Sequence, residues 1–78
     1  MNCFLRLNKD LTGQKIKQHI IRSGMTYDQV ADEIGLASSR VIYDWTNGLK
    51  MPSIENLVRF SRTVDTVIED ILVIENIF

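Results

Sequence analysis

One short stretch, residues 37–48, gathers side chains that could bond to or stack on a ligand; it reads ASSRVIYDWTNG. Arg40 is a permanent cation with a rigid fork of donors, Tyr43 combines a ring with a hydroxyl, and Asp44 is an acceptor. The stretch has one regularly spaced apolar pair, Ile42 and Trp45, which a short helix would turn to one side. The polar side chains near its start are therefore expected to stay outside the core.

Catalytic chemistry has little support in the sequence. There is one histidine, His19, and one cysteine, Cys3. His19 has Lys15 and Arg22 as neighbours and no acid or nucleophile at a useful spacing, so we expect a surface histidine. No cluster of metal-ligand residues and no Gly-rich phosphate loop occurs. We therefore expect no enzyme, no metal site and no cofactor.

Charge is unevenly distributed along the 78 residues, although the net charge is only −1. All nine Lys and Arg lie in residues 1–62 together with six acids, which gives +3, whereas residues 63–78 hold four acids and no base, which gives −4. This asymmetry suggests a basic working body and an acidic end that faces elsewhere. Chance clustering on a solvated surface is the alternative.

Length and composition place the chain among small globular domains. Residues 1–78 are expected to form one domain with a modest core, about 12–72. A single cysteine fits a reducing compartment. Neither a signal peptide nor a run of about 18 apolar residues occurs, so we expect a cytoplasmic protein.

Turn and capping residues divide the chain into short helices. The first is expected over 12–23, ended by Gly24. The second starts at Thr26, which has capping-box spacing with Gln29, and ends at Gly35. Its buried face is expected to hold Val30, Ala31 and Ile34.

The third helix is expected over Ser39–Thr46, with Ser38 as its N-cap and Asn47-Gly48 as its end. The fourth begins after Ser53, and its three- and four-residue steps predict a core face of Ile54, Leu57, Val58, Ser61 and Val64. Thr66 and Glu69 suggest another capping box that opens a last helix with Ile68, Ile71 and Leu72. The expected fold is all-α, a compact bundle of four to five short helices.

The ordered set of these features resembles the XRE or phage-repressor type of helix-turn-helix, the family of lambda-like repressors and Cro proteins. The resemblance covers roughly residues 12–72. The residues that carry it are the Thr26-capped helix with Val30-Ala31, Ile34-Gly35, the serine cap, Ile42, Trp45-x-Asn47-Gly48, Pro52-Ser53 and Leu57. It implies a DNA-binding regulator of bacterial, phage or mobile-element origin, usually a dimer on a near-palindromic site and most often a repressor.

The resemblance also implies roles for individual residues. In such domains the second helix of the motif enters the major groove and its first residues meet base edges. The implied base contacts are Ser39, Arg40, Val41, Tyr43 and Asp44. The implied phosphate contacts are Thr26, Tyr27, Asn47, Gly48 and Lys50. Tyr27 stands where many members carry a phosphate-binding Gln.

Each of these roles has a plainer alternative. Arg40 could bind a phosphate or pair with Asp44, which could itself be a structural salt-bridge partner. Tyr43 could be a partly buried surface aromatic, and Val41 could lie at the margin of the core. The basic residues Lys15, Lys17 and Arg22 could contact phosphates or simply form a solvated face.

The end of the chain, residues 73–78, is unusually apolar. Together with Ile71 it predicts a homodimer interface at the C-terminal region, formed by Ile71, Ile74, Ile77 and Phe78. The alternative is that the tail folds back against Phe4, Leu5 and Leu7. A second class of function also stays open: an antitoxin or protein-interaction module on the same fold, with a partner protein on the tail.

Overall fold

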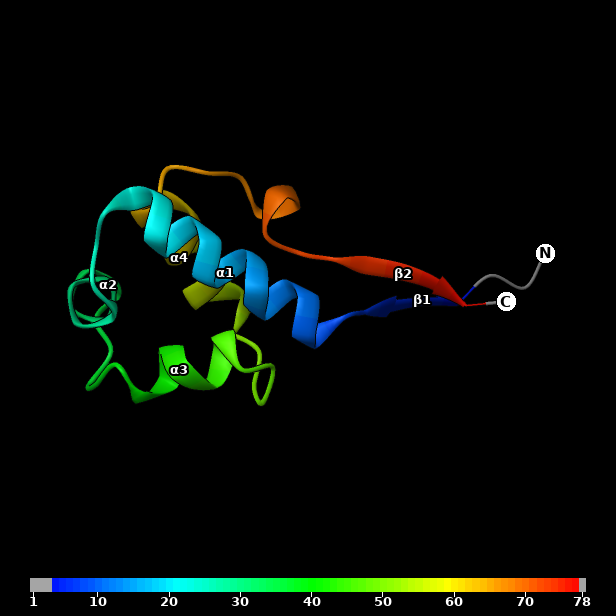
Figure 1. Cartoon of the computed structure of the whole chain (residues 1–78), viewed down its shortest axis with the longest axis horizontal. Coiled ribbons are helices and arrows are strands. Elements are labelled where there is room, and N and C mark those ends of the chain that lie inside the picture. The colour runs from blue at the N-terminus through cyan, green and yellow to red at the C-terminus, as the bar shows by residue number, and fades with distance from the viewer. Residues whose placement is uncertain (1–3, 78) are drawn as a thin grey trace.

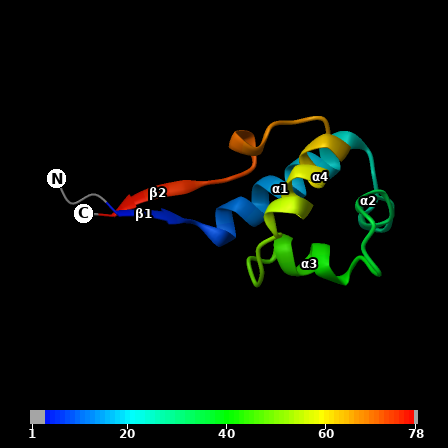
Figure 2. The same cartoon turned by 180° about the vertical axis from the view of Figure 1, so that it is seen from behind.

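Four helices surround one core, and a two-stranded ribbon extends from one side of them (Figures 1 and 2). The structure is a computed structural model that describes residues 4–77. The elements follow in the order β1 (Phe4–Leu7), α1 (Lys9–Ser23), α2 (Tyr27–Ile34), α3 (Arg40–Thr46), α4 (Ile54–Thr63), the 3-10 helix η1 (Ile68–Asp70) and β2 (Ile74–Ile77). The expected helical bundle is confirmed, with a ribbon added to it.

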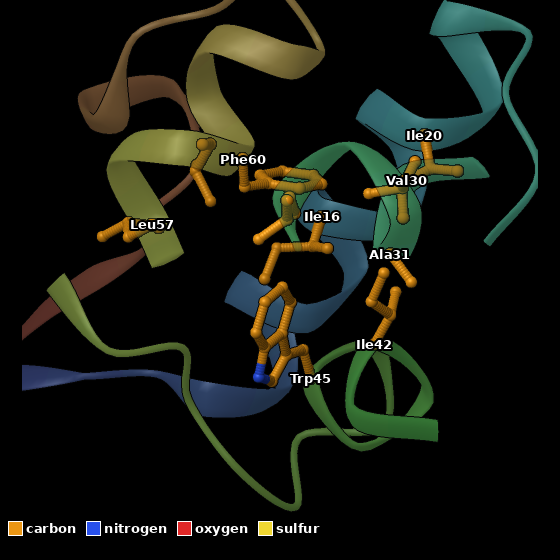
Figure 3. Close-up of a cluster of buried hydrophobic side chains, with 10 residues drawn as sticks. Ile16, Ile20, Val30, Ala31, Ile42, Trp45, Leu57 and Phe60 are labelled. Atoms are coloured by element: carbon orange, nitrogen blue, oxygen red, sulfur yellow. The ribbon is translucent and has the colours of Figure 1, made fainter. Parts of the chain in front are cut away.

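The core draws on every helix (Figure 3). Trp45 of α3 meets Phe60 of α4 edge to face, with ring centroids 6.4 Å apart and planes at 83°. This T-shaped arrangement is a favoured aromatic geometry. The other buried apolar side chains are Ile16, Ile20, Val30, Ala31, Ile34, Ile42, Leu57 and Ile71. The predicted inner face of α2 is therefore confirmed.

The chain ends form the ribbon, which the sequence does not predict as strands. β1 and β2 are antiparallel, with Leu5 opposite Asn76 and Leu7 opposite Ile74. Arg6 and Glu75 face each other in an ion pair of 3.0 Å. The tail therefore folds back along residues 4–7, which is the alternative stated above. The side chains of Phe4 and Ile77, and the whole of Phe78, lie outside the described part of the structure.

Hydrogen bonds at the base of the ribbon join it to α1. The Asn8 backbone N–H donates to the Val73 carbonyl at 2.8 Å, and the Val73 N–H donates to the buried Thr12 hydroxyl at 2.9 Å. Asn8 is also the N-cap of α1, because its side chain accepts from the Leu11 N–H at 2.9 Å. That cap starts α1 at Lys9, three residues before the predicted start.

Two predictions about the C-terminal third are wrong in part. Of the predicted core face of α4, Leu57 and Ser61 are buried and Val64 packs against the core. In α4 the buried side chains are Leu57, Phe60 and Ser61, whereas Ile54 is 83% exposed and Val58 36% exposed. The predicted core face did not include Phe60, whose ring packs against Trp45. Ile54 lies in the first turn, where no described side chain covers it.

The last helix is also shorter than predicted. Thr66 and Glu69 form no capping box, because η1 has only three residues and begins after Val67, which makes no side-chain cap. The chain leaves α4 through Asp65, which has a left-handed φ of 56°, and then runs extended through Val67. Ile71 is fully buried in the core. It is therefore excluded from the surface predicted for dimerisation.

Candidate nucleic-acid interface

α2 and α3 form two short helices joined by a tight turn. α2 has the predicted capping box: the Gln29 N–H donates to the Thr26 hydroxyl at 3.1 Å, and the Thr26 N–H donates to the Gln29 side chain at 2.8 Å. α2 ends at Gly35, which takes the left-handed conformation at φ 89°. The lengths and the glycine in the turn are those of a helix-turn-helix.

The start of α3 differs slightly from the prediction. The helix begins at Arg40, and the residue before it, Ser39, makes no side-chain cap and has helical dihedral angles. The hydroxyl of Ser38 accepts from the Arg40 N–H at 3.3 Å. Ser38 thus supplies the expected hydroxyl two residues before Arg40, through a long hydrogen bond.

The end of α3 is closed by its own backbone. Gly48 has a φ of 74°, its N–H donates to the Trp45 carbonyl at 3.1 Å, and the Leu49 N–H donates to the Asp44 carbonyl at 2.9 Å. This pair of bonds is the Schellman motif, which favours glycine at the left-handed position. The Gly48 N–H is therefore already bonded within the chain, and the Asn47 N–H donates to the Tyr43 carbonyl at 3.0 Å.

Close contact with α1 holds α3 in place. Ile42 is fully buried and Trp45 is 2% exposed. Gly13 of α1 lies against the end of α3, so that a Cβ atom at Gly13 would come within 2.8 Å of the Thr46 carbonyl oxygen and closer still to that of Trp45. A glycine at this point of α1 lets the two backbones approach closely. This role of Gly13 is not predicted above, although an isolated glycine inside a helical pattern is a signal for it.

The opposite side of α3 carries exposed side chains. Arg40 is exposed and forms no ion pair with any residue of the described chain, 4–77. Val41 is 36% exposed and Tyr43 is 53% exposed. Ser39 is half-buried at the edge of the same surface. α3 thus presents a cation, a ring and an apolar side chain to solvent.

The pair between Arg40 and Asp44, which the sequence leaves open as an alternative to a base contact, does not form. Asp44 is instead 3.9 Å from the Lys50 ammonium group, and its side chain is only 25% exposed. The Lys50 side chain is 72% exposed and reaches outward from the loop after α3. The pair places one positive and one negative charge at the end of α3, so this part of the surface is locally neutral.

α2 and α3 also touch through two tyrosines. The rings of Tyr27, the first residue of α2, and Tyr43 have centroids 4.4 Å apart and planes inclined by 46°. Tyr27 is half-buried and packs against the core cluster. The structure therefore brings together one predicted phosphate contact and one predicted base contact, a contact that the sequence does not predict.

The remaining predicted contacts lie at the two ends of this surface. Thr26 is exposed at the start of α2, where its hydroxyl already accepts one bond from Gln29. Asn47 is exposed after α3, next to the half-buried Gly48. The basic side chains of α1, Lys15, Lys17 and Arg22, are also exposed.

Residues 4–77 hold neither a metal-ligand cluster nor a membrane-spanning helix. Nowhere in this range do three or more His, Cys, Asp or Glu side chains gather closely enough to hold a metal ion. None of the helices in the same range has the length and apolarity needed to cross a membrane.

Comparisons with known proteins agree with this geometry. A helix-turn-helix family model, HTH_3, matches residues 16–69. Among solved structures, the restriction-modification controller protein C.AhdI from Aeromonas hydrophila is similar in fold, with a TM-score of 0.73 and 16% sequence identity over 80% of this chain and 88% of that chain. A search of curated proteins found no match.

Proposed function

We propose a function from one premise: the chain belongs to the helix-turn-helix family, in its XRE or phage-repressor type. The family is one of DNA-binding regulators. We infer that this member binds a specific double-stranded sequence in the cytoplasm and acts as a repressor by occupying it. The observation that carries the proposal is the two-sided α3, whose Ile42 and Trp45 are buried while Arg40 and Tyr43 face solvent.

In the proposed complex α3 lies in the major groove with its first turn at the base edges. Arg40 is the main specificity residue, because its guanidinium can donate two bonds to the O6 and N7 atoms of guanine, worth about 1–3 kcal/mol of discrimination. Its lack of an ion pair within residues 4–77 leaves the guanidinium available. Val41 and the Tyr43 ring fit the methyl group of thymine, and the Ser39 hydroxyl can bond to any base edge.

Asp44 is proposed as an acceptor for the cytosine amino group. A carboxylate near phosphates is unfavourable unless its charge is offset. Lys50, at 3.9 Å, provides that offset. Since the Lys50 ammonium group is also exposed, the same lysine can bind a phosphate beside the groove.

The proposed phosphate contacts flank the groove-facing side of α3. Thr26 and Tyr27 offer hydroxyl groups at the start of α2, and Asn47 offers its side-chain amide after α3. The Gly48 backbone is proposed to lie at the sugar-phosphate chain without donating its N–H, which already bonds to the Trp45 carbonyl. Each phosphate neutralised by a cation should add about −0.9 to the slope of log affinity against log salt.

Substitution of Arg40 tests the proposal. We expect Arg40→Ala to weaken binding to the specific site by about 5- to 150-fold and to relax the preference at one guanine. Arg62→Ala is the matched control, since Arg62 is an exposed arginine in the last turn of α4 and is not among the residues proposed to contact DNA. Gel shifts with DNA from upstream of the protein's own gene, at two salt concentrations, measure both. The absence of any specific band, with Arg40→Ala equal to wild type, would contradict the proposal.

We further propose that the regulator is a homodimer joined through its C-terminal region, now defined as the ribbon of β1 and β2. A two-stranded ribbon alone is marginally stable in water and gains from another surface to pack on. Leu5 is 69% exposed and Ile74 is 58% exposed on one face of this ribbon. A two-fold axis there would set two α3 helices about 34 Å apart, one turn of DNA.

Sedimentation at micromolar concentration tests the dimer. Ile74→Glu is expected to shift the protein to a monomer, whereas Ile54→Glu, which changes the 83% exposed isoleucine on α4, should leave a dimer intact. A wild-type monomer would refute this interface. The alternative function, an antitoxin or interaction module that holds a partner protein on the ribbon, uses the same exposed side chains; the gel shift above separates it from the regulator.

A further inference from the structure

The contact between Tyr27 and Tyr43 joins the two helices on the side proposed to face DNA. The ring centroids are 4.4 Å apart, near the short limit for aromatic pairs, and the tilt of 46° lies between stacked and edge-to-face packing. The two residues come from different helices of the motif: Tyr27 opens α2, and Tyr43 lies in the middle of α3. The orientation of one ring therefore restricts the orientation of the other.

The two rings differ in how firmly they are held. Tyr27 directly follows the capping box of Thr26, and its ring packs against the core cluster. Tyr43 is 53% exposed and lies on the outer side of α3. Ile42 and Trp45, which precede and follow it along the helix, are buried on the inner side. Within residues 4–77 neither hydroxyl has a hydrogen-bond partner. The Tyr27 ring is thus the fixed member, and the Tyr43 ring is the one that it restrains.

We propose that Tyr27 is a positioning residue: its ring holds the Tyr43 ring in the orientation in which Tyr43 meets the base edge. The inference rests on the proposed function, because it assigns a specificity role within the same surface. A side chain held in its bound orientation loses less conformational freedom on binding, so discrimination at its base pair increases. The ring of Tyr27, and not its hydroxyl, carries this effect.

The phosphate contact proposed for the Tyr27 hydroxyl is a separate role of the same residue. The two roles make different predictions. A hydroxyl bonded to a phosphate adds affinity for every DNA sequence and carries no base information. A ring that orients Tyr43 adds discrimination only at the base pair that Tyr43 contacts.

Base preferences measured on a randomised duplex library distinguish these roles. Wild type, Tyr27→Phe, Tyr27→Leu, Tyr43→Ala and the double variant Tyr27→Leu/Tyr43→Ala are each bound to the library and the selected DNA is sequenced. Leu fills much of the ring's volume and so keeps the fold, and urea unfolding of each variant checks this. A competition gel shift then gives the affinity for single-base variants of the selected site.

We expect Tyr43→Ala to flatten the preference at one or two adjacent positions. Tyr27→Leu should flatten the same positions, by about 2- to 13-fold, while the guanine preference assigned to Arg40 persists. The double variant should lose no more base discrimination than Tyr43→Ala alone, because both changes remove the same contact between the Tyr43 ring and the base pair. Tyr27→Phe, which keeps the ring, should keep the wild-type base preference and lose only the affinity that a phosphate bond of the hydroxyl adds for every sequence.

Two results would overturn the inference while leaving the proposed function intact. One is a Tyr27→Leu protein that selects the wild-type motif with evenly lowered affinity. The other is a Tyr27→Phe protein that loses as much discrimination as Tyr27→Leu. A folded wild-type protein that selects no motif from the library would instead overturn the proposed function itself, and the inference with it.

Discussion

The two helices of the motif differ in what defines their ends. α2 is closed by local chemistry at both ends, with a reciprocal capping box at Thr26 and Gln29 and the left-handed Gly35. The Arg59 side chain of α4 adds a 3.4 Å bond to the Ile34 carbonyl. α3 has a strong local signal only at its end, since Ser39 makes no side-chain cap and Ser38 accepts a long bond.

The contrast shows how a surface helix can be both exposed and fixed. α3 has seven residues, too few for a helix to be stable by propensity alone. Its position depends on Ile42 and Trp45 in the core and on the close approach of Gly13. Because packing on one side holds the helix, the side chains at its start are not needed to keep it in place. Those are the residues proposed to meet the bases.

The largest expected effect comes from filling the gap between α1 and α3. Helix propensity alone predicts that Gly13→Ala stabilises α1 by about 1 kcal/mol. The added Cβ would press on the carbonyl oxygens of Trp45 and Thr46, which are backbone atoms and cannot turn aside. We expect a net loss of about 2 kcal/mol in the free energy of unfolding, measured by urea denaturation.

The neighbouring residue supplies the control for Gly13. Gln14 is exposed on α1, so Gln14→Ala should change the free energy of unfolding by less than about 0.5 kcal/mol. Gly13→Ala should also weaken DNA binding, because α3 must shift to make room. A Gly13→Ala protein more stable than wild type would show that α3 is not held by this contact.

An intermediate effect is expected at the capped start of α2. Thr26→Ala removes the hydroxyl that accepts from the Gln29 N–H at 3.1 Å, which should cost about 1 kcal/mol of unfolding free energy. Thr26→Ser keeps an acceptor and should retain most of the stability. Equal losses in the Ala and Ser variants would mean that the methyl group, and not the cap, supports α2.

The same contrast explains which parts of the fold the sequence predicts. The start and end of α2 are predicted correctly, because capping residues and glycines act on neighbours within four positions. The tail's approach to residues 4–7 is left open as an alternative, but the strands are not predicted, because the Arg6–Glu75 pair joins residues 69 positions apart and each strand has only four residues. Periodicity alone also did not choose between Ile54 and Phe60, which both lie three residues from Leu57. Phe60 is the buried one, and it packs in the core with the Trp45 ring among its neighbours.

The candidate surface likewise has features that the sequence predicts and features that it does not. The spacing of Ile42 and Trp45 correctly predicts the buried side of α3, and so leaves Arg40 and Tyr43 outside. The contacts among the exposed residues could not be predicted, because they depend on where separate elements meet. Lys50 reaches Asp44 from the following loop, and Tyr27 reaches Tyr43 from α2.

The smallest expected effect lies at the start of α3. The bond from the Arg40 N–H to the Ser38 hydroxyl is exposed and 3.3 Å long, so water can replace it at little cost. We expect Ser38→Ala to lower the free energy of unfolding by less than about 0.5 kcal/mol, under half the effect of Thr26→Ala measured in the same urea titration. If Ser38→Ala instead costs as much as Thr26→Ala, α3 depends on its local cap as α2 does. Packing on the inner side of α3 would then not be enough to explain why its first residues are available to contact DNA.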